Sequence, residues 1–241
     1  SEEELKETRV TQPAVFLHSY IAYRCLAKEK PDMVAGHSLG EFTALAVNGC
    51  LTFEDTLRLV AQRAIAMQHA CEKYSSGMAV VLKFDDRITE KICAEITDEV
   101  VVPANYNCPQ QLVISGSKAG LATAIERLTE AGAHRIMMLN VGGAFHSPLM
   151  KPAQEELTAA INTYTFHQPF CPIYQNVNGI ASTKPDEIRQ NIIDQLTKPV
   201  LWTHTIQNMV QDGAKQFAEF GPGNTLQGLL KRIDSSIIFI E

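Results

Sequence analysis

The sequence predicts an α/β fold in which a smaller unit is inserted into a larger one. Segments with strand-like and helix-like hydrophobic spacing alternate along most of the chain, which is typical of a sheet covered by helices. Between residues 76 and 142 the order becomes β-α-β-β-α-β, the signature of a ferredoxin-like subdomain. We therefore expect a large subdomain formed by residues 1–75 and 143–241, and a small one formed by residues 76–142.

The part before the insertion predicts helices joined through one short strand. Thr11 is a plausible cap of the first helix, because Pro13 then falls in its first turn. Thr52 is the expected cap of another long helix. The expected helices here are residues 11–30, 41–47 and 52–74, and the expected strand is residues 33–35.

The remaining elements follow from the same periodicity. In the small subdomain we expect strands at residues 77–84, 100–106, 111–115 and 135–141, and helices at residues 87–96 and 119–131. After Pro148 we expect a helix, a strand at residues 172–177, a helix at 186–196 and a strand at 217–220. A last helix should end near Ile233, with Asn224 or Thr225 as its cap.

The composition excludes several classes of protein. The chain has 241 residues, of which 45% are hydrophobic, so it can bury a sizeable core. Its net charge of -6 argues against binding nucleic acid. The six cysteines form no C-x-x-C pair, which indicates reduced cysteines in a cytoplasmic protein rather than a disulfide or zinc framework. No apolar run approaches the roughly 20 residues that span a membrane, and the acidic start is unlike a signal peptide.

The strongest chemical signal is Gly36-x-Ser38-x-Gly40, with a predicted strand before it and a predicted helix after it. This context is that of a nucleophile elbow, which presents a serine hydroxyl on a tight turn. We expect both glycines to be required because the turn packs closely. Ser38 is then the nucleophile, and the N–H of Leu39 is a donor to an oxyanion. The alternative is a glycine-rich turn without chemistry.

A serine nucleophile needs a base, and His146 is the best placed of the seven histidines. It follows the last strand of the small subdomain, where the chain returns to the large one, and such crossings line clefts. His37 is adjacent to Ser38 and should point away from it on the elbow. A surface or core role is the alternative for each of these histidines.

Arg63 lies off the polar stripe of its predicted helix, among apolar residues. A buried guanidinium needs an anion. The alternatives are an internal ion pair with an Asp or Glu and a bidentate clamp on a substrate carboxylate. For the Gly-Pro-Gly-Asn segment at residues 221–224, a turn with a helix cap is favoured over a phosphate site.

Six segments of the chain are similar to segments of one known family, in which the second, third, fifth and sixth occur in the same order. They are Thr11-Gln12-Pro13-Ala14, Gly36-His37-Ser38-Leu39-Gly40-Glu41, Gln62-Arg63-x-x-x-Met67, Asn105-x-Asn107-x-Pro109-x-Gln111, Ala144-Phe145-His146-Ser147 and Gly221-Pro222-Gly223. In these segments, which extend over essentially the whole chain, the sequence resembles malonyl-CoA:acyl-carrier-protein transacylases. The resemblance implies an α/β-hydrolase-like large subdomain beside the ferredoxin-like small one.

The resemblance also implies a reaction. A malonyl group passes from CoA to Ser38, and then to the phosphopantetheine thiol of acyl carrier protein, for fatty acid biosynthesis. His146 carries the proton and is oriented by the backbone carbonyl of Gln195. Arg63 pairs with the malonyl carboxylate, and the ring of Phe145 leaves little room for an α-methyl branch. No cofactor and no metal are implied.

Two further expectations concern partners. The carriers of this family are acidic, and Arg135 is the residue we expect in their docking surface, with an ordinary solvated arginine as the alternative. The enzyme is expected to be a monomer that binds neither nucleic acid nor membrane.

The family begins with an F-P-G-Q-G-x-Q loop, whose glutamine supplies a second donor to the oxyanion. This chain has no such loop, so we expect an N-terminal segment to be missing from it. Three alternative functions stay open: a serine hydrolase or thioesterase, in which water replaces the carrier thiol; an acyltransferase for a polyketide-type carrier; and a non-catalytic docking piece.

Overall fold

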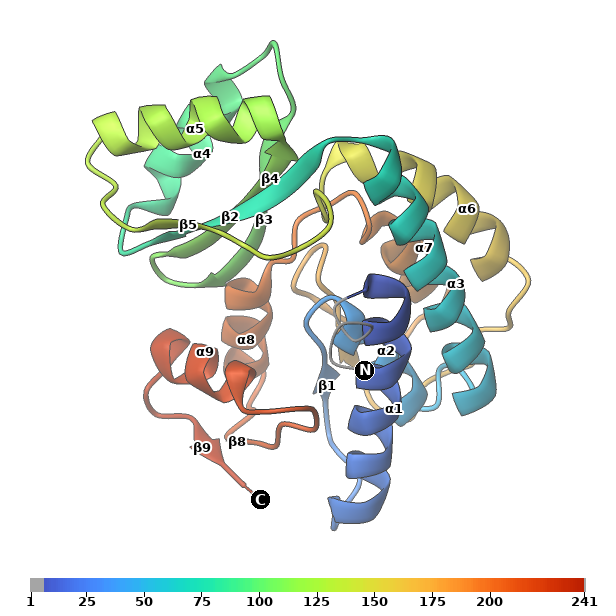
Figure 1. Ribbon diagram of the computed structural model, residues 1–241. Coiled ribbons are helices and arrows are strands. Elements are labelled where there is room, and N and C mark those ends of the chain that lie inside the picture. The colour runs from blue at the N-terminus through green and yellow to red at the C-terminus, as the bar shows by residue number, and fades with distance from the viewer. Residues whose placement is uncertain (1–6, 241) are drawn as a thin grey trace.

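A computed structural model describes residues 7–240 of the chain. Figure 1 shows a small lobe, coloured green, beside a larger body built from both ends of the sequence. The elements before residue 76 are α1 (Thr8–Leu26), β1 (Val34–Ala35), α2 (Leu39–Val47) and α3 (Phe53–Lys73). The α3 helix packs between α1 and α6 (Lys151–Ile161), and these helices enclose the largest apolar core.

The first helix begins and ends earlier than the sequence predicts. Thr11 is not its cap, because its own N–H already bonds the carbonyl of Glu7 at 2.9 Å inside the helical ladder. The helix ends at Leu26, since Ala27 adopts an extended conformation. Thr52, in contrast, caps α3 as predicted, with its side chain accepting from the N–H of Asp55 at 3.1 Å.

The small lobe has the predicted β-α-β-β-α-β order. Its elements are β2 (Ser76–Leu82), α4 (Asp86–Glu95), β3 (Val101–Cys108), β4 (Gln111–Ser117), α5 (Lys118–Glu130) and β5 (Ile136–Met138). The strands lie in the order β3-β4-β2-β5 with every neighbouring pair antiparallel, which is the ferredoxin-like arrangement. All these elements fall within residues 76–142, but the exact boundaries of the two subdomains stay a prediction.

The two faces of this sheet have different partners. Alternate residues of β2 point to opposite sides, as the pleat requires. Ala79 and Val81 join the core under α4 and α5. Met78 and Val80 face the other way and pack with a cluster that includes Phe145, the residue before His146. The small sheet therefore supports the segment that carries the predicted base.

The remaining elements complete the larger body. They are a 3-10 turn (Pro148–Met150), α6, β6 (Ile173–Tyr174), β7 (Ala181–Ser182), α7 (Pro185–Asp194), α8 (Trp202–Gln211), β8 (Gln216–Phe217), α9 (Thr225–Ile233) and β9 (Ile238–Phe239). In the main sheet, β1 pairs in parallel with β6, and β6 pairs antiparallel with β7. The strands β8 and β9 form a separate parallel pair. The prediction missed α8, although Trp202, Ile206 and Met209 recur at helical spacing and are buried.

Asn224 takes the N-cap position of α9, as predicted, but its side chain makes no capping hydrogen bond, and Glu219 caps the helix in its place. The carboxylate of Glu219 accepts the N–H groups of Leu226 and Gln227 at 3.0 and 2.9 Å. These first-turn donors are therefore already satisfied from within the chain. Across the described ranges, no helix is long and apolar enough to cross a membrane.

Candidate active site

Ser38 lies at the sharp turn between β1 and α2. Its backbone has φ 52° and ψ −105°, on the positive-φ side that residues other than glycine rarely adopt. Gly36 makes the turn possible, because a Cβ there would lie 2.0 Å from the carbonyl carbon of Gly40. A Cβ on Gly40 would meet nothing described within 4 Å outside its own helix, so the prediction that both glycines are sterically required was wrong.

The strained turn is held by Asn176, which follows β6. The side-chain oxygen of Asn176 accepts the N–H of Ser38 at 2.7 Å, and its amide nitrogen donates to the carbonyl of Gly36 at 2.7 Å. One buried amide thus closes the turn on both sides of the serine. Sequence reasoning gave Asn176 no role, and no motif among the six segments contains it.

The structure brings Ser38 and His146 together. The distance from Ser38 Oγ to His146 Nε2 is 2.8 Å, and that from His146 Nδ1 to the carbonyl oxygen of Gln195 is 2.9 Å. A carbonyl only accepts, so Nδ1 carries the proton and Nε2 is left to accept from the serine hydroxyl. The partner of Nδ1 is a carbonyl and not a carboxylate, as the resemblance implied.

His146 is held in its neutral form. It is 3% exposed, and its burial, together with the positive charge of Arg63, lowers its pKa to about 3. At neutral pH the imidazole therefore has a free lone pair on Nε2 and can take a proton from Ser38. The backbone of His146 also lies at positive φ, 58°, so both partners of the pair occupy strained positions.

Arg63 reaches the same serine from α3. Its side chain is 1% exposed, and Nη2 donates to Ser38 Oγ and to Gln195 Oε1, both at 3.1 Å. Nη1 donates to the side-chain oxygen of Gln12, and the guanidinium lies over the ring of Phe42. Burial lowers the pKa of Arg63 to about 10, so it stays charged at neutral pH.

The hydrogen-bond partners of Arg63 favour the clamp over a direct ion pair, and the clamp stays a prediction. Within residues 7–240 they are neutral oxygens, and no acidic side chain forms an ion pair with Arg63. Its Nε, moreover, has no hydrogen-bond partner among these residues. The buried carboxylate of Glu41 acts on Arg63 through its charge and not through a direct hydrogen bond. The guanidinium, which points at the serine, can therefore still bond a carboxylate there.

Two glutamines support the site. Gln12 is buried on α1, where it joins Arg63 to Thr8 through a 2.7 Å hydrogen bond. Gln195 was predicted for its backbone carbonyl, but its side chain takes part as well. Its Nε2 donates to the carbonyl of Ser38 at 3.0 Å. Gln12 was part of a matched segment, and only its buried position in the fold reveals its contact with Arg63.

The other predicted residues lie around this centre. Leu39 is the first residue of α2, and its N–H has no hydrogen-bond partner among the described residues, so it is free for an oxyanion. His37 bonds Asn107 at 2.8 Å and packs edge-on against Trp202. It is therefore engaged elsewhere than with Ser38, as expected.

Phe145 and Arg135 differ in their exposure to solvent. The ring of Phe145 is partly buried and packs against both the main core and the small sheet. Arg135 is exposed and lies just before β5, where its carbonyl accepts the N–H of Leu82 at 2.9 Å. The prediction placed Arg135 in the strand, but the strand begins one residue later, at Ile136.

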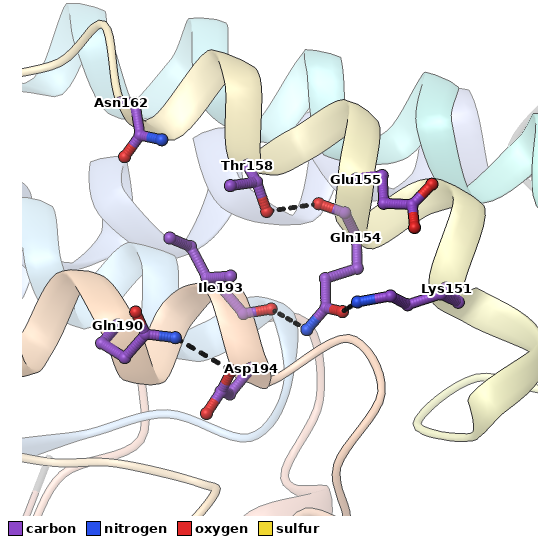
Figure 2. A pocket seen from close by; sticks show the side chains of 8 residues that line it. All are labelled: Lys151, Gln154, Glu155, Thr158, Asn162, Gln190, Ile193 and Asp194. Carbon is purple, nitrogen blue, oxygen red and sulfur yellow. Dashed lines mark hydrogen bonds between the residues drawn. The ribbon is translucent and has the colours of Figure 1, made fainter.

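Two hollows lie in the larger body, and one of them reaches the elbow. A groove of about 1220 Å³ runs between β1 and β8 and reaches Leu39 and Gly40 at the elbow. A smaller surface pocket of about 510 Å³ lies between α6 and α7 (Figure 2). In it the side chain of Gln154 donates to the carbonyl of Ile193 and accepts from the ammonium of Lys151. None of the predicted site residues lines that pocket.

Comparison with known proteins gives the chain its family. Residues 1–235 match the family model described as the acyl transferase domain. The chain belongs to the acyl transferase domain family. A family member from Staphylococcus aureus (strain MRSA252), named malonyl CoA-acyl carrier protein transacylase, is 37% identical over 98% of this chain and 77% of its own length.

Solved structures of the acyl transferase family share the fold. The crystal structure of the MCAT from Streptococcus pneumoniae has 38% sequence identity and a TM-score of 0.95 over 99% of this chain and 79% of its own. A malonyl-transacylase in complex with a type II PKS acyl-carrier protein has 34% identity and a TM-score of 0.94 over 99% of this chain and 79% of its own. The predicted α/β fold, with its α/β-hydrolase-like and ferredoxin-like parts, is thereby confirmed.

Proposed function

We propose that this chain is an acyltransferase that moves a malonyl group from CoA to the phosphopantetheine thiol of an acyl carrier protein. The observation that carries the proposal is the convergence on one hydroxyl. Ser38 Oγ lies 2.8 Å from the Nε2 of a neutral histidine and 3.1 Å from the Nη2 of a buried guanidinium. A nucleophile, a base and a carboxylate-binding group thus meet at a single point.

In the first half-reaction, Ser38 Oγ attacks the thioester carbonyl while its proton passes to His146 Nε2. The free N–H of Leu39 stabilises the oxyanion. The C–S bond then breaks, and the proton moves from His146 to the departing thiolate. CoA leaves, and the malonyl group stays on Ser38 as an ester. In the second half-reaction the carrier thiol gives its proton to His146 and attacks the ester, and Ser38 regains a proton.

Arg63 selects the acyl group in this proposal. The malonyl carboxylate gives the guanidinium a directly bonded anion, where its present partners are neutral oxygens. A neutral acyl group would leave the guanidinium without a directly bonded anion, which disfavours the wrong substrate. Phe145, beside His146, narrows the space at the α-carbon of the acyl group and disfavours a methyl branch there.

The partner is an acidic carrier protein that docks beside the exposed Arg135. A family member of similar fold was solved with a type II PKS acyl-carrier protein, which favours a polyketide-type carrier as a second candidate to that of fatty acid synthesis. We further propose a cytoplasmic monomer, with the small subdomain bounded at residues 76 and 142. Arg135→Glu should slow transfer to the carrier and leave the malonylation of Ser38 intact.

The function is tested with labelled malonyl-CoA. The label should become attached to the protein, be absent from the Ser38→Ala variant, and be discharged by holo-carrier protein much faster than by water. Carriers from fatty acid and polyketide synthesis, compared at equal concentration, identify the acceptor. Discharge by water alone would make the protein a hydrolase. Arg63→Ala should lower the ratio of malonyl to acetyl transfer, and an unchanged ratio would refute the clamp.

A further inference from the structure

A carboxylate lies buried directly beneath the elbow, and the proposed mechanism does not use it. Glu41 is in the first turn of α2, and none of its side chain is exposed. Its Oε1 accepts from Gln175 Nε2 at 3.0 Å. Its Oε2 accepts from the backbone N–H of Asn176 at 3.0 Å and from Gln195 Nε2 at 2.9 Å. All three donors are neutral amides, so the carboxylate acts through directional hydrogen bonds.

Two of these donors belong to the residues that hold the reactive pair. Asn176 fixes the backbone on both sides of Ser38, as described above. Gln195 bonds the carbonyl of Ser38 with its side chain and His146 Nδ1 with its own carbonyl. The buried carboxylate is therefore connected to the backbone of Ser38 through Asn176, and to the imidazole of His146 through Gln195. It also connects the elbow to the segment that orients the base.

The third donor is locked in its orientation. Gln175 Nε2 also donates to the carbonyl of Ile188 at 3.2 Å, and its Oε1 accepts from Asn191 at 2.8 Å. The amide of Gln175 cannot turn over without losing both contacts. Position 41 must therefore present an acceptor at each of its two oxygens. A glutamine has one acceptor and one donor, so it cannot satisfy all three neighbours.

We infer that Glu41 is a positioning residue, whose ionised carboxylate fixes Asn176 and Gln195 and, through them, the elbow and the imidazole of His146. The inference rests on the proposed roles of Ser38 and His146. Its physical basis is preorganisation, since a displacement of about 1 Å at the reacting atoms can cost roughly 10²-fold in rate.

The protonation of Glu41 makes this role sensitive to pH. Burial raises the pKa of Glu41 to about 7, although its three amide donors and the charge of Arg63 lower it. Protonation would place a donor where the amides need an acceptor. The other titratable groups of the site lie outside this range, because the pKa of Arg63 is lowered to about 10 and that of His146 to about 3. The pKa of His37 is also lowered by its burial.

The test compares Glu41→Gln and Glu41→Asp with a matched control. Glu219→Gln also removes a carboxylate that accepts two N–H groups, but at the start of α9. Two rates are measured from pH 5 to 9: the malonylation of Ser38 and its labelling by a serine-directed fluorophosphonate. The probe requires no malonyl recognition, so it reports the reactivity of the serine even where the proposed substrate is wrong.

For Glu41→Gln we expect both rates to fall about 10²-fold at pH 8 with little change in KM for malonyl-CoA. Its rate should no longer fall as pH decreases through 7, unlike that of the wild type. Glu41→Asp keeps the charge and should recover part of the rate, while Glu219→Gln should match the wild type. If Glu41→Gln does not fold, the Asp variant and the wild-type pH profile still decide.

Three results would overturn the inference: a Glu41→Gln rate within twofold of the wild type, an equal loss in Glu219→Gln, or a wild-type probe rate that is flat between pH 5 and 8. A wild type that fails to accept malonyl, but whose probe labelling still depends on Glu41, would refute the proposed function and leave the positioning role intact.

Discussion

Buried side chains in the small subdomain, built from β2 to β5 with α4 and α5, are mostly apolar, whereas those around Ser38 are polar or charged. The core under α4 and α5 consists of aliphatic residues, alanines and Cys93. Around Ser38, the side chains of Glu41, Arg63 and His146 are at most 3% exposed. One region therefore gains stability from apolar burial, while the other bears the cost of desolvated charge for its chemistry.

Backbone strain shows the same contrast. Lys83 and Gln110 adopt positive φ in the small subdomain, but they lie in turns that reach solvent. The N–H of Lys83 donates to the Gln110 carbonyl at 2.8 Å, and the backbone of Gln110 also bonds Asp86. Ser38 and His146 are strained within the site, where buried amides hold them. Substitutions around Ser38 should therefore mainly change the activity, and substitutions in the small subdomain should mainly change the stability.

The largest expected effect is on activity, from a change in the site. His146→Ala should slow the malonylation of Ser38 by about 10²–10⁴-fold, because a positioned general base contributes about that much. The same residue should also make the free energy of unfolding depend on pH. The pKa of His146 is about 3 in the folded protein against an ordinary 6.5. Below pH 6.5 the imidazole of His146 is therefore protonated in the unfolded chain but stays neutral in the folded wild type.

Relative to His146→Ala, the wild type should thus lose about 1.4 kcal/mol for each pH unit below 6.5. Urea unfolding of both proteins at pH 7.5 and 5 measures this, and the difference between them should change by about 2 kcal/mol. Parallel pH dependences in the two proteins would mean that the imidazole is not buried in its neutral form.

The second prediction concerns the two glycines of the elbow. Gly36→Ala should cost more than about 4 kcal/mol, because its Cβ would overlap backbone that cannot move independently of the turn. Gly40→Ala places its Cβ in open space and should be close to neutral. Thermal unfolding of the two variants provides the measurement. Similar losses in both would show that the elbow is packed differently from the structure.

The third prediction concerns the small subdomain. Leu128 on α5 is fully buried among aliphatic neighbours. Leu128→Ala should destabilise the protein by about 3 kcal/mol, within the usual range of roughly 2–5 for such a truncation. The malonylation rate of the folded fraction should stay within about twofold of the wild type. A rate loss larger than the loss of folded protein would indicate that the two regions are coupled.

The sequence predicts the small subdomain well for a physical reason. Its strands and helices are separated by clear turns. The burial of α5 follows the helical period, and β2 is a short, almost continuously buried run, as expected for a strand packed on both faces. The ends of elements are less predictable, since no strong local signal marks them. The first helix begins after Glu7, whose side chain makes no capping hydrogen bond, and not at Thr11. The helix α8 was missed even though its apolar spacing was present.

Some residues of the candidate site could be predicted from the sequence and others could not. Ser38 and His146 could be predicted because a local turn pattern and a position between subdomains indicate them. Asn176, Gln12 and the side chain of Gln195 could not, because their roles consist of contacts between residues more than 50 positions apart in the chain. A single polar side chain, in a helix or in a loop, carries no local signal of the partner that it will meet in the folded protein.

The smallest expected effect lies where the two regions meet. Gly143 belongs to the segment that leads from β5 to His146, and a Cβ there would lie 2.4 Å from Cys71 Sγ and 3.2 Å from Cys71 Cβ. Gly143→Ala should therefore destabilise the protein by about 1–3 kcal/mol through overpacking.

Cys71→Ala removes the nearer of these two contacts and leaves the other, so it should relieve the strain of Gly143→Ala only in part. In a double-mutant cycle measured by urea unfolding, we expect a favourable coupling of at least about 0.5 kcal/mol. The malonylation rate should follow the same pattern, falling in Gly143→Ala and recovering partly in the double variant, because the displaced segment carries the base. Strictly additive free energies would mean that Gly143 and Cys71 do not touch, and that the path from the small sheet to His146 is looser than the structure indicates.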